Sequence, residues 1–332
     1  MENNENAENT NSKIKEIIRL ATLAPSGHNT QPWYFSVNKN VITILPDYSR
    51  SLPVVDPDDH ALFISLGCAL ENLVIAAEQY GYRPDIKYSL EKEKSEKIEI
   101  ELKKNDDFRD NELFKAIPQR QATRQQFNGK PIPEKDLQTL NTASSQEGVI
   151  FKIFTEETEI EPLIEFVKEG NRIQFNNKRF VDELVSWIRF SKADAQRLRD
   201  GLRSAVMGAP SIPQWMGKVI MKFSSPENEA KKCEKSIKSS SGLMLFIAMN
   251  DDRLSWINLG RSFERVVLRA TLLNIKHAHL NMPCEEISVR QKLQKHLGLS
   301  NEQPLLLLRI GYADSMPKSF RRPVEDVLKT AL

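Results

Sequence analysis

Two apolar helical segments, far apart in the chain, carry closely similar residue patterns. The segment Ile64-Ser65-Leu66-Gly67-Cys68-Ala69-Leu70-Glu71-Asn72-Leu73 resembles the segment Ile257-Asn258-Leu259-Gly260-Arg261-Ser262-Phe263-Glu264-Arg265-Val266. One interpretation is an internal repeat, in which similar structural units stack and bury a common core. The other is a chance similarity between two amphipathic helices. If the repeat is real, the chain folds as two similar halves whose long helices pack together.

The hydrophobic periodicity predicts helices interleaved with strands. Helices are expected over residues 12–24, 56–80, 112–117, 159–189 and 254–275, and in a segment that begins at 134. Strands are expected over residues 33–37, 41–45, 85–90, 97–102, 149–154, 242–248 and 304–310. Residues 190–229 are expected to be irregular. Strand, helix and strand do not alternate regularly. The pattern therefore favours an α+β sandwich over a doubly wound parallel sheet.

The composition excludes several classes of protein. The chain has 332 residues, which corresponds to about two domains. Its 47 Lys and Arg residues nearly balance 45 Asp and Glu residues, so charge gives no reason to expect a nucleic-acid or membrane partner. Residues 1–12 are mostly Asn, Glu, Thr and Ser, which predicts a disordered tail on a cytoplasmic protein. Three cysteines without a CxxC spacing exclude a disulfide framework and the usual structural zinc site.

The first motif that carries chemistry is the run from Ala24 to Trp33, Ala-Pro-Ser-Gly-His-Asn-Thr-Gln-Pro-Trp. A loop of this composition presents backbone groups and short polar side chains to a flat polar ligand, and Gly27 lets the backbone approach closely. The alternative is a plain connection between a helix and a strand, with Trp33 buried in the core. The residues alone favour this alternative.

Two further segments are rich in arginine. In Arg120-Gln121-Ala122-Thr123-Arg124-Gln125-Gln126-Phe127, two arginines four residues apart can hold a phosphate through charge-assisted hydrogen bonds. The C-terminal run Lys318-Ser319-Phe320-Arg321-Arg322 is also basic. The alternative for both segments is an ordinary solvated basic surface.

Together these motifs resemble the nitroreductase superfamily. The run 24–33 is similar to the family's flavin-contacting loop, the run 120–127 to its FMN-phosphate element, and the helix 66–81 to its dimer-core helix. The resemblance implies ring contacts from Pro25, Ser26, Gly27, His28 and Asn29, and phosphate contacts from Arg120, Arg124, Arg321 and Lys318. Ala122 stands where the family has a hydroxyl, so Thr123 is expected to replace that hydrogen bond.

The resemblance extends to the flavin atom that accepts hydride. The segment Leu280-Asn281-Met282-Pro283-Cys284-Glu285 is similar to the loop that places a backbone N–H against flavin N5, which implies Pro283, Cys284 and Glu285 as contacts. A weaker match over 170–179 implies Asn176 and Arg179 at the pyrimidine edge of the ring. No protein acid or base is expected, and Cys284 lacks an identifiable base that would make it a nucleophile.

No metal site is expected. His277 and His279 lie two residues apart at a helix end, so they would face different directions in a helix. A metal site needs a third ligand, and none is indicated. We therefore assign both histidines a structural role.

The motifs are divided between the two passes of the chain. Residues 13–115 hold the ring loop, whereas residues 116–332 hold the phosphate arginines, the N5 loop and a lid-like insertion at about 187–230. In ordinary members of the superfamily, two subunits supply these elements. The chain therefore resembles the Acg-type branch of the superfamily. The resemblance implies an α+β, three-layer αβα architecture in which two halves form a self-contained pseudo-dimer with one FMN site. Such a chain could be a monomer in solution.

Two functions fit this resemblance. The first is an FMN-dependent oxidoreductase that takes hydride from NAD(P)H through flavin N5 and passes electrons to a nitroaromatic, quinone or similar acceptor. The second is an FMN-binding protein that sequesters the flavin beneath a closed lid with little or no turnover. Trp187, Met207, Trp215, Met216 and Met221 favour such a lid, although they could simply pack a helical excursion onto the core.

Overall fold

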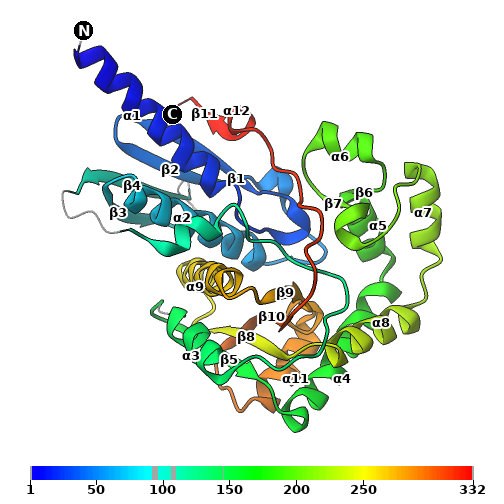
Figure 1. Ribbon diagram of the computed structural model, residues 1–332. Coiled ribbons are helices and arrows are strands. Elements are labelled where there is room, and N and C mark those ends of the chain that lie inside the picture. Colours follow the sequence, from blue (N-terminus) through cyan, green and yellow to red (C-terminus); the bar gives the residue numbers. More distant parts are fainter. Residues whose placement is uncertain (1, 92–95, 106–109, 145, 331–332) are drawn as a thin grey trace.

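The computed structural model describes residues 2–91, 96–105, 110–144 and 146–330, with side chains from residue 11. Two β-sheets enclose a central layer of long helices, and a further group of helices covers the outer face of one sheet (Figure 1). The predicted α+β class is confirmed. We refer to the sheet formed mainly by residues 33–104 as sheet A, and to the sheet formed by residues 149–311 as sheet B.

Sheet A has strand order β11-β1-β2-β4-β3. Its elements in chain order are α1 (Glu2–Ala21), β1 (Trp33–Asn38), β2 (Val41–Pro46), α2 (His60–Gln79), β3 (Tyr82–Ser89) and β4 (Lys97–Lys104), with short 3-10 helices at Gly27–Asn29, Tyr48–Arg50 and Glu112–Ala116. Alternate residues of β2 and β4 are buried, because one face of the sheet packs on the helices and the other does not.

Sheet B has strand order β5-β8-β10-β9, and all its pairs are antiparallel. Its elements are α3 (Glu134–Ala143), β5 (Val149–Phe154), α4 (Glu157–Asn176), β8 (Gly242–Ala248), α9 (Arg253–Leu272), β9 (Lys276–His279), α10 (Met282–Glu285), α11 (Ile287–His296) and β10 (Gln303–Gly311). Every residue of β8 is buried, since helices cover both faces of this sheet. The three predicted layers are therefore complete around sheet B.

The two central helices meet at the repeated glycines. A Cβ atom added at Gly67 of α2 would lie 2.1 Å from the carbonyl oxygen of Ile257, and one at Gly260 of α9 would lie 2.0 Å from that of Ile64. Each helix thus uses the same residue of the repeat to contact the same residue of the other. This reciprocity is the signature of a twofold relation, and it confirms that the two segments pack together.

The segment between α4 and β8 differs from expectation. It contains α5 (Lys178–Trp187), β6 (Ile188–Arg189), α6 (Lys192–Leu198), β7 (Leu202–Arg203), a 3-10 turn (Ser204–Met207), α7 (Gln214–Lys222) and α8 (Pro226–Lys238). The single helix predicted over 159–189 is broken at Asn177, whose side chain accepts a 3.0 Å hydrogen bond from the Arg179 N–H and begins a new helix. The region 190–229, predicted as irregular, is largely helical because α5, β6 and β7 form a small apolar cluster of their own against Leu52 and Val55.

Both ends of the described chain lie beside sheet A (Figure 1). After β10, the chain crosses back from sheet B, and α12 (Val324–Val327) leads into β11 (Leu328–Lys329), which pairs in parallel with β1. At the other end, α1 includes residues 2–12, for which the sequence predicted disorder. Buried Ile14, Ile17 and Ile18 fix the helix, and extending a formed helix is easier than starting one, so α1 continues although Asn and Thr are weak helix formers.

Helix α2 is long and apolar enough to span a membrane by composition, with a mean hydropathy of 1.6 over 18 residues. However, 94% of that window is buried inside the protein. The apolar composition is explained by its position in the central layer, where α9, α1 and sheet A surround it.

Candidate functional site

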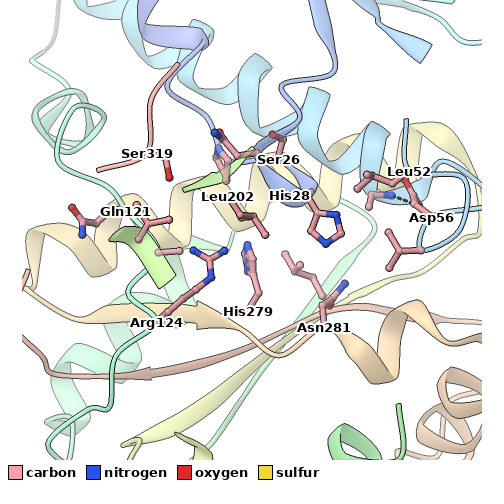
Figure 2. Close-up of a pocket in the computed structure, with 18 of the residues that line it drawn as sticks. Ser26, His28, Leu52, Asp56, Gln121, Arg124, Leu202, His279, Asn281 and Ser319 are labelled. Atoms are coloured by element: carbon pink, nitrogen blue, oxygen red, sulfur yellow. Dashed lines mark hydrogen bonds between the residues drawn. The ribbon is translucent and has the colours of Figure 1, made fainter. Parts of the chain in front are cut away.

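A cavity of about 360 Å³ lies where the two sheets, the C-terminal crossing and the α5–α7 segment meet. Its lining comes from segments 25–29, 117–124, 171–180, 279–285 and 317–321. Figure 2 shows His28 and Leu202 pointing toward Arg124, His279 and Asn281 across this space. The cavity size lies in the range of small-molecule sites. It brings together motifs that are up to 300 residues apart.

The predicted ring loop forms one wall of the cavity. After α1 ends, Pro25, Ser26 and Gly27 lead into a tight turn in which His28 (φ 46°) and Asn29 (φ 56°) adopt the left-handed conformation. The Ser26 hydroxyl accepts a 2.9 Å hydrogen bond from the backbone N–H of Gln31 and closes the turn. All five predicted ring-contact residues line the cavity.

The ring loop is fastened to the α5–α7 segment. The Asn29 side chain donates a 3.0 Å hydrogen bond to the Gly201 carbonyl, and the Gly201 N–H donates a 3.1 Å bond to the Asn29 carbonyl. Gln31 donates a 3.0 Å bond to the Arg199 carbonyl. Leu202 and Val206 then continue from this junction into the cavity lining.

Four cationic side chains gather at one end of the cavity: Arg120, Arg124, Lys318 and Arg321. Arg321 donates a 2.9 Å hydrogen bond to the Asn29 side chain and 3.1 Å bonds to the carbonyls of Leu23 and Ala24. Arg120 donates a 3.2 Å bond to the Leu23 carbonyl. The end of α1 therefore holds two arginines from distant parts of the chain. Burial and the neighbouring Arg120 lower the pKa of Arg321 to about 9.

Arg124 differs from the other two arginines because its charge lacks a partner. Among the described residues, none forms a hydrogen bond or ion pair with its guanidinium group, which points into the cavity (Figure 2). Burial lowers its pKa, so the site holds a cation at an energetic cost. Lys318, by contrast, donates a hydrogen bond to the Pro118 carbonyl. This arrangement can bind an anion such as a phosphate.

The opposite part of the cavity is lined by carboxamides and by the carboxyl groups of Asp56 and Glu285. Gln174 of α4 donates a 2.7 Å hydrogen bond to one Glu285 oxygen, and Asn281 donates a 3.3 Å bond to the other. Burial raises the pKa of Glu285, and these two donors oppose that shift. Gly170 lets α4 approach closely, since a Cβ there would lie 2.8 Å from the Met282 carbonyl carbon.

Two histidines face the cavity as neutral groups. Burial and Arg124 lower the pKa of His28 to about 4. The same causes, with Arg120, lower the pKa of His279 to about 3. At neutral pH both imidazoles therefore offer one donor and one acceptor without adding charge. The structural role assigned to His279 from the sequence is thus incomplete, because its side chain lines the cavity.

Five of the predicted contact residues do not line the cavity. Asn176 and Arg179 are exposed, whereas their neighbours Phe175 and Phe180, together with Asn171 and Gln174, line the cavity. Pro283 and Cys284 are buried in the core, because the helical turn α10 directs Met282 and Glu285 toward the cavity. Thr123 also points inward: its segment is extended alongside His277, so Ala122 and Arg124 face the cavity and Thr123 does not.

Asn171 and Gln174 could have been found from their spacing. They lie three residues apart on α4, which places them on one face with Gly170. The sequence match over 170–179 instead selected Asn176, the last residue of α4, and Arg179 of α5, which are both exposed. His279 offered no comparable signal, because its position depends on β9 pairing with β10.

One group of described residues has ligand atoms close enough to hold a metal ion. Asp56, Asp58 and His60 place such atoms within 4.8 Å of one another. However, Asp56 already accepts 2.9 Å hydrogen bonds from the backbone N–H groups of Ala61 and Leu62, and Arg290 lies 3.4 Å from Asp58. These contacts explain the group as an anionic cap on the N-terminus of α2.

Comparisons with known proteins find nitroreductases. A family described as "Putative TM nitroreductase" matches residues 2–77. The Mycobacterium tuberculosis protein named "Putative NAD(P)H nitroreductase Rv3131" is 23% identical over 323 residues, covering 95% of this chain and 91% of that protein. The protein named "Putative NAD(P)H nitroreductase acg", from the same organism, is 23% identical over 330 residues, 96% of each chain.

The resemblance to the nitroreductases is confirmed. It extends over nearly the whole chain and includes an Acg-type relative, as the divided motifs predicted. A solved Bacteroides fragilis nitroreductase with bound FMN is similar at 17% identity and a TM-score of 0.39, over 64% of this chain and 95% of that chain.

Proposed function

We propose that the chain is an FMN-dependent oxidoreductase that takes hydride from NAD(P)H and passes electrons to a nitroaromatic, quinone or similar acceptor. The observation that carries the proposal is the convergence of Arg120, Arg124 and Arg321 at one end of a cavity whose wall is the ring loop. Both curated relatives are named as NAD(P)H nitroreductases, which supports the same chemistry.

The residues present fit FMN at both ends of the cavity. Arg124, Arg120 and Arg321 would hold the phosphate, and the unpaired charge of Arg124 is the group that most needs an anion. The loop 25–29 and the carboxamides of Asn171, Gln174 and Asn281 would border the polar ring. When bound, the flavin supplies hydride acceptance and electron transfer. The protein's part is to orient the ring and set its electrostatic surroundings.

The same geometry fits the proposed division of the chain. The ring loop comes from residues 13–115, and the arginines come from residues 116–332. We infer that the two parts act as a fused pseudo-dimer with one flavin site, so no second chain is needed to complete it. The close approach of α2 and α9 at Gly67 and Gly260 sets the distance between these parts.

A second function is favoured by one specific observation. The α5–α7 segment is hydrogen-bonded to the ring loop through Asn29, Gln31 and Gly201, and it contributes Leu202 and Val206 to the cavity lining. A segment fastened in this way would restrict access to the ring. The alternative function is therefore an FMN-sequestering protein with little or no turnover.

Anaerobic mixing distinguishes the two functions. The FMN-loaded protein is mixed with NADH or NADPH while the absorbance of the oxidised flavin is followed. Loss of absorbance, with recovery after addition of a nitroaromatic or quinone, supports the oxidoreductase. If dithionite reduces the flavin and neither nicotinamide does, the oxidoreductase proposal is wrong and sequestration stands.

A further inference from the structure

A buried carboxyl group lies behind the cationic end of the cavity. Glu264 of α9 has no exposed surface, and its Oε1 lies 3.4 Å from the Nε of Arg120. Neither Glu264 oxygen makes a well-formed hydrogen bond within the described part of the chain. The side chain does not line the cavity, whereas Arg120 does. Glu264 therefore acts on the cavity only through its neighbours.

The repeat supplies an internal comparison for this residue. Glu71 of α2 occupies the position in its segment that Glu264 occupies in α9. Glu71 is equally buried, but its two oxygens are bonded to Arg261 at 2.8 Å and Arg265 at 2.5 Å. Glu71 is thus fully paired, and Glu264 is not. Of these two equivalent carboxyl groups, the unpaired one therefore lies on the side of the pseudo-twofold axis that carries the cationic cavity.

The arginines beside Glu264 also have unsatisfied groups. The Nε atoms of Arg120 and Arg321 are buried without a well-formed hydrogen bond among the described residues. The backbone carbonyls of Leu23 and Ala24 fix the other ends of these side chains. The two arginines are therefore held in place between backbone acceptors and a carboxyl group, next to an anion-binding cavity.

We propose that Glu264 is a positioning residue that balances the charge of Arg120 and Arg321 before the cofactor phosphate binds and takes up a proton when it binds. The inference rests on the proposed function, since it assumes that FMN is the ligand. A phosphate carries nearly two negative charges at neutral pH. Placing it on the same arginines disfavours the ionised form of Glu264.

The electrostatics of the surroundings support proton uptake at Glu264 rather than elsewhere. Burial raises the pKa of Glu264 to about 7, although Arg120, the Asn72 amide and Arg321 oppose the shift. On the facing helix, burial raises the pKa of the Cys68 thiol well above its usual value, so that group stays neutral. Glu71, also on α2, keeps its two arginine partners.

The sign of the pH dependence follows from these charges. FMN binding raises the pKa of Glu264, so the complex holds more protons than the free protein above about pH 7. FMN affinity therefore falls as pH rises from about 7 to 8.5. Each unit by which binding raises that pKa weakens the affinity at high pH by about tenfold. Below pH 7, Glu264 is largely protonated in both states and contributes little.

The test measures FMN affinity from pH 6.5 to 8.5 by flavin fluorescence, together with proton uptake by calorimetry in two buffers of different ionisation enthalpy. Glu264→Gln keeps the shape of the side chain and removes its titration, whereas Glu264→Asp keeps a carboxyl group. Glu71→Gln is the matched control, because it changes the equivalent carboxyl of the repeat, which has Arg261 and Arg265 as partners in place of the cavity arginines. Riboflavin, which lacks the phosphate, is the control ligand.

We expect wild type and E71Q to lose about tenfold in FMN affinity across this range and to take up protons. E264Q should lose most of both effects, with a small remainder from Arg321, whose pKa is about 9. E264D should retain part of both effects, and riboflavin binding should not depend on pH. If wild type and E264Q had the same dependence of FMN affinity on pH, or if wild type took up no protons, the role of Glu264 would be overturned but the proposed function would not. A wild type that binds no FMN at any pH would instead overturn the proposed function.

Discussion

The crossing of α2 and α9 gives a prediction whose size can be worked out from the structure. In Gly260→Ala, the new Cβ would lie 2.0 Å from the carbonyl oxygen of Ile64, about 1 Å closer than real Cβ contacts allow. The obstacle is backbone, so a rotamer change cannot relieve it and the helices must separate. Overpacking of a core costs about 1–3 kcal/mol, and a backbone clash belongs at the upper end of this range.

A gain in helix propensity offsets part of this cost. Alanine is about 1 kcal/mol more favourable than glycine within a helix. The expected net loss of unfolding free energy is therefore about 2 kcal/mol, or roughly 3 °C in Tm for a chain of 332 residues. Gly67→Ala should behave alike, because its Cβ would lie 2.1 Å from the Ile257 carbonyl oxygen. Separation of the helices also moves the ring loop away from the arginines, so FMN binding should weaken.

Urea titration and thermal unfolding measure the effect. The control is Asn141→Ala, which gains helix propensity at an exposed position of α3 and meets no neighbour across a helix contact. It should leave the unfolding free energy unchanged or slightly higher. If G260A were as stable as wild type, the two helices would not cross at these glycines, and the pseudo-twofold arrangement would be wrong.

Three further predictions concern single side chains. Gln174→Ala removes the 2.7 Å hydrogen bond to Glu285. It should therefore raise the pKa of Glu285 further and change the midpoint potential of the bound flavin. Asn176→Ala, on the exposed surface, is the control and should do neither. Burial and Arg120 hold the pKa of His277 well below its usual value, so below pH 6.5 the unfolded chain binds more protons than the folded chain. The urea concentration at the midpoint of unfolding should therefore fall as pH drops from 6.5 to 4.5. The fall should be smaller in His277→Gln. Burial raises the pKa of the Cys284 thiol, so native protein should resist iodoacetamide at this cysteine, and Cys284→Ala should leave flavin reduction by dithionite unchanged.

The central fold could be predicted because its signals are local. The apolar stripes of α2 and α9 and their glycines are visible in the residues themselves, and so are the alternating strands of sheet A. The short strands β6, β7 and β11 could not be predicted. They contain two residues each, and their pairing depends on segments such as β1 that lie far away in the chain.

The site could be predicted where a motif faces the cavity along its whole length. The ring loop does so because its tight turn exposes consecutive residues. Where regular structure divides a motif between core and cavity, only some of the predicted residues line the cavity. An extended segment buries Thr123 beside Arg124, and a helical turn buries Cys284 beside Glu285. Such a division depends on packing against sheet B, which no local pattern records.

The central claim is that this cavity binds one FMN per chain through its arginines. The most direct measurement is the flavin content of the reconstituted wild type and of the double variant Arg120→Ala/Arg124→Ala after removal of free ligand. Each lost charge-assisted contact costs about 1.5–3 kcal/mol, so the double variant should bind at least about a hundredfold more weakly. The account predicts one FMN per wild-type chain and a colourless double variant. Two flavins per chain, or a yellow double variant with unchanged flavin content, would contradict it.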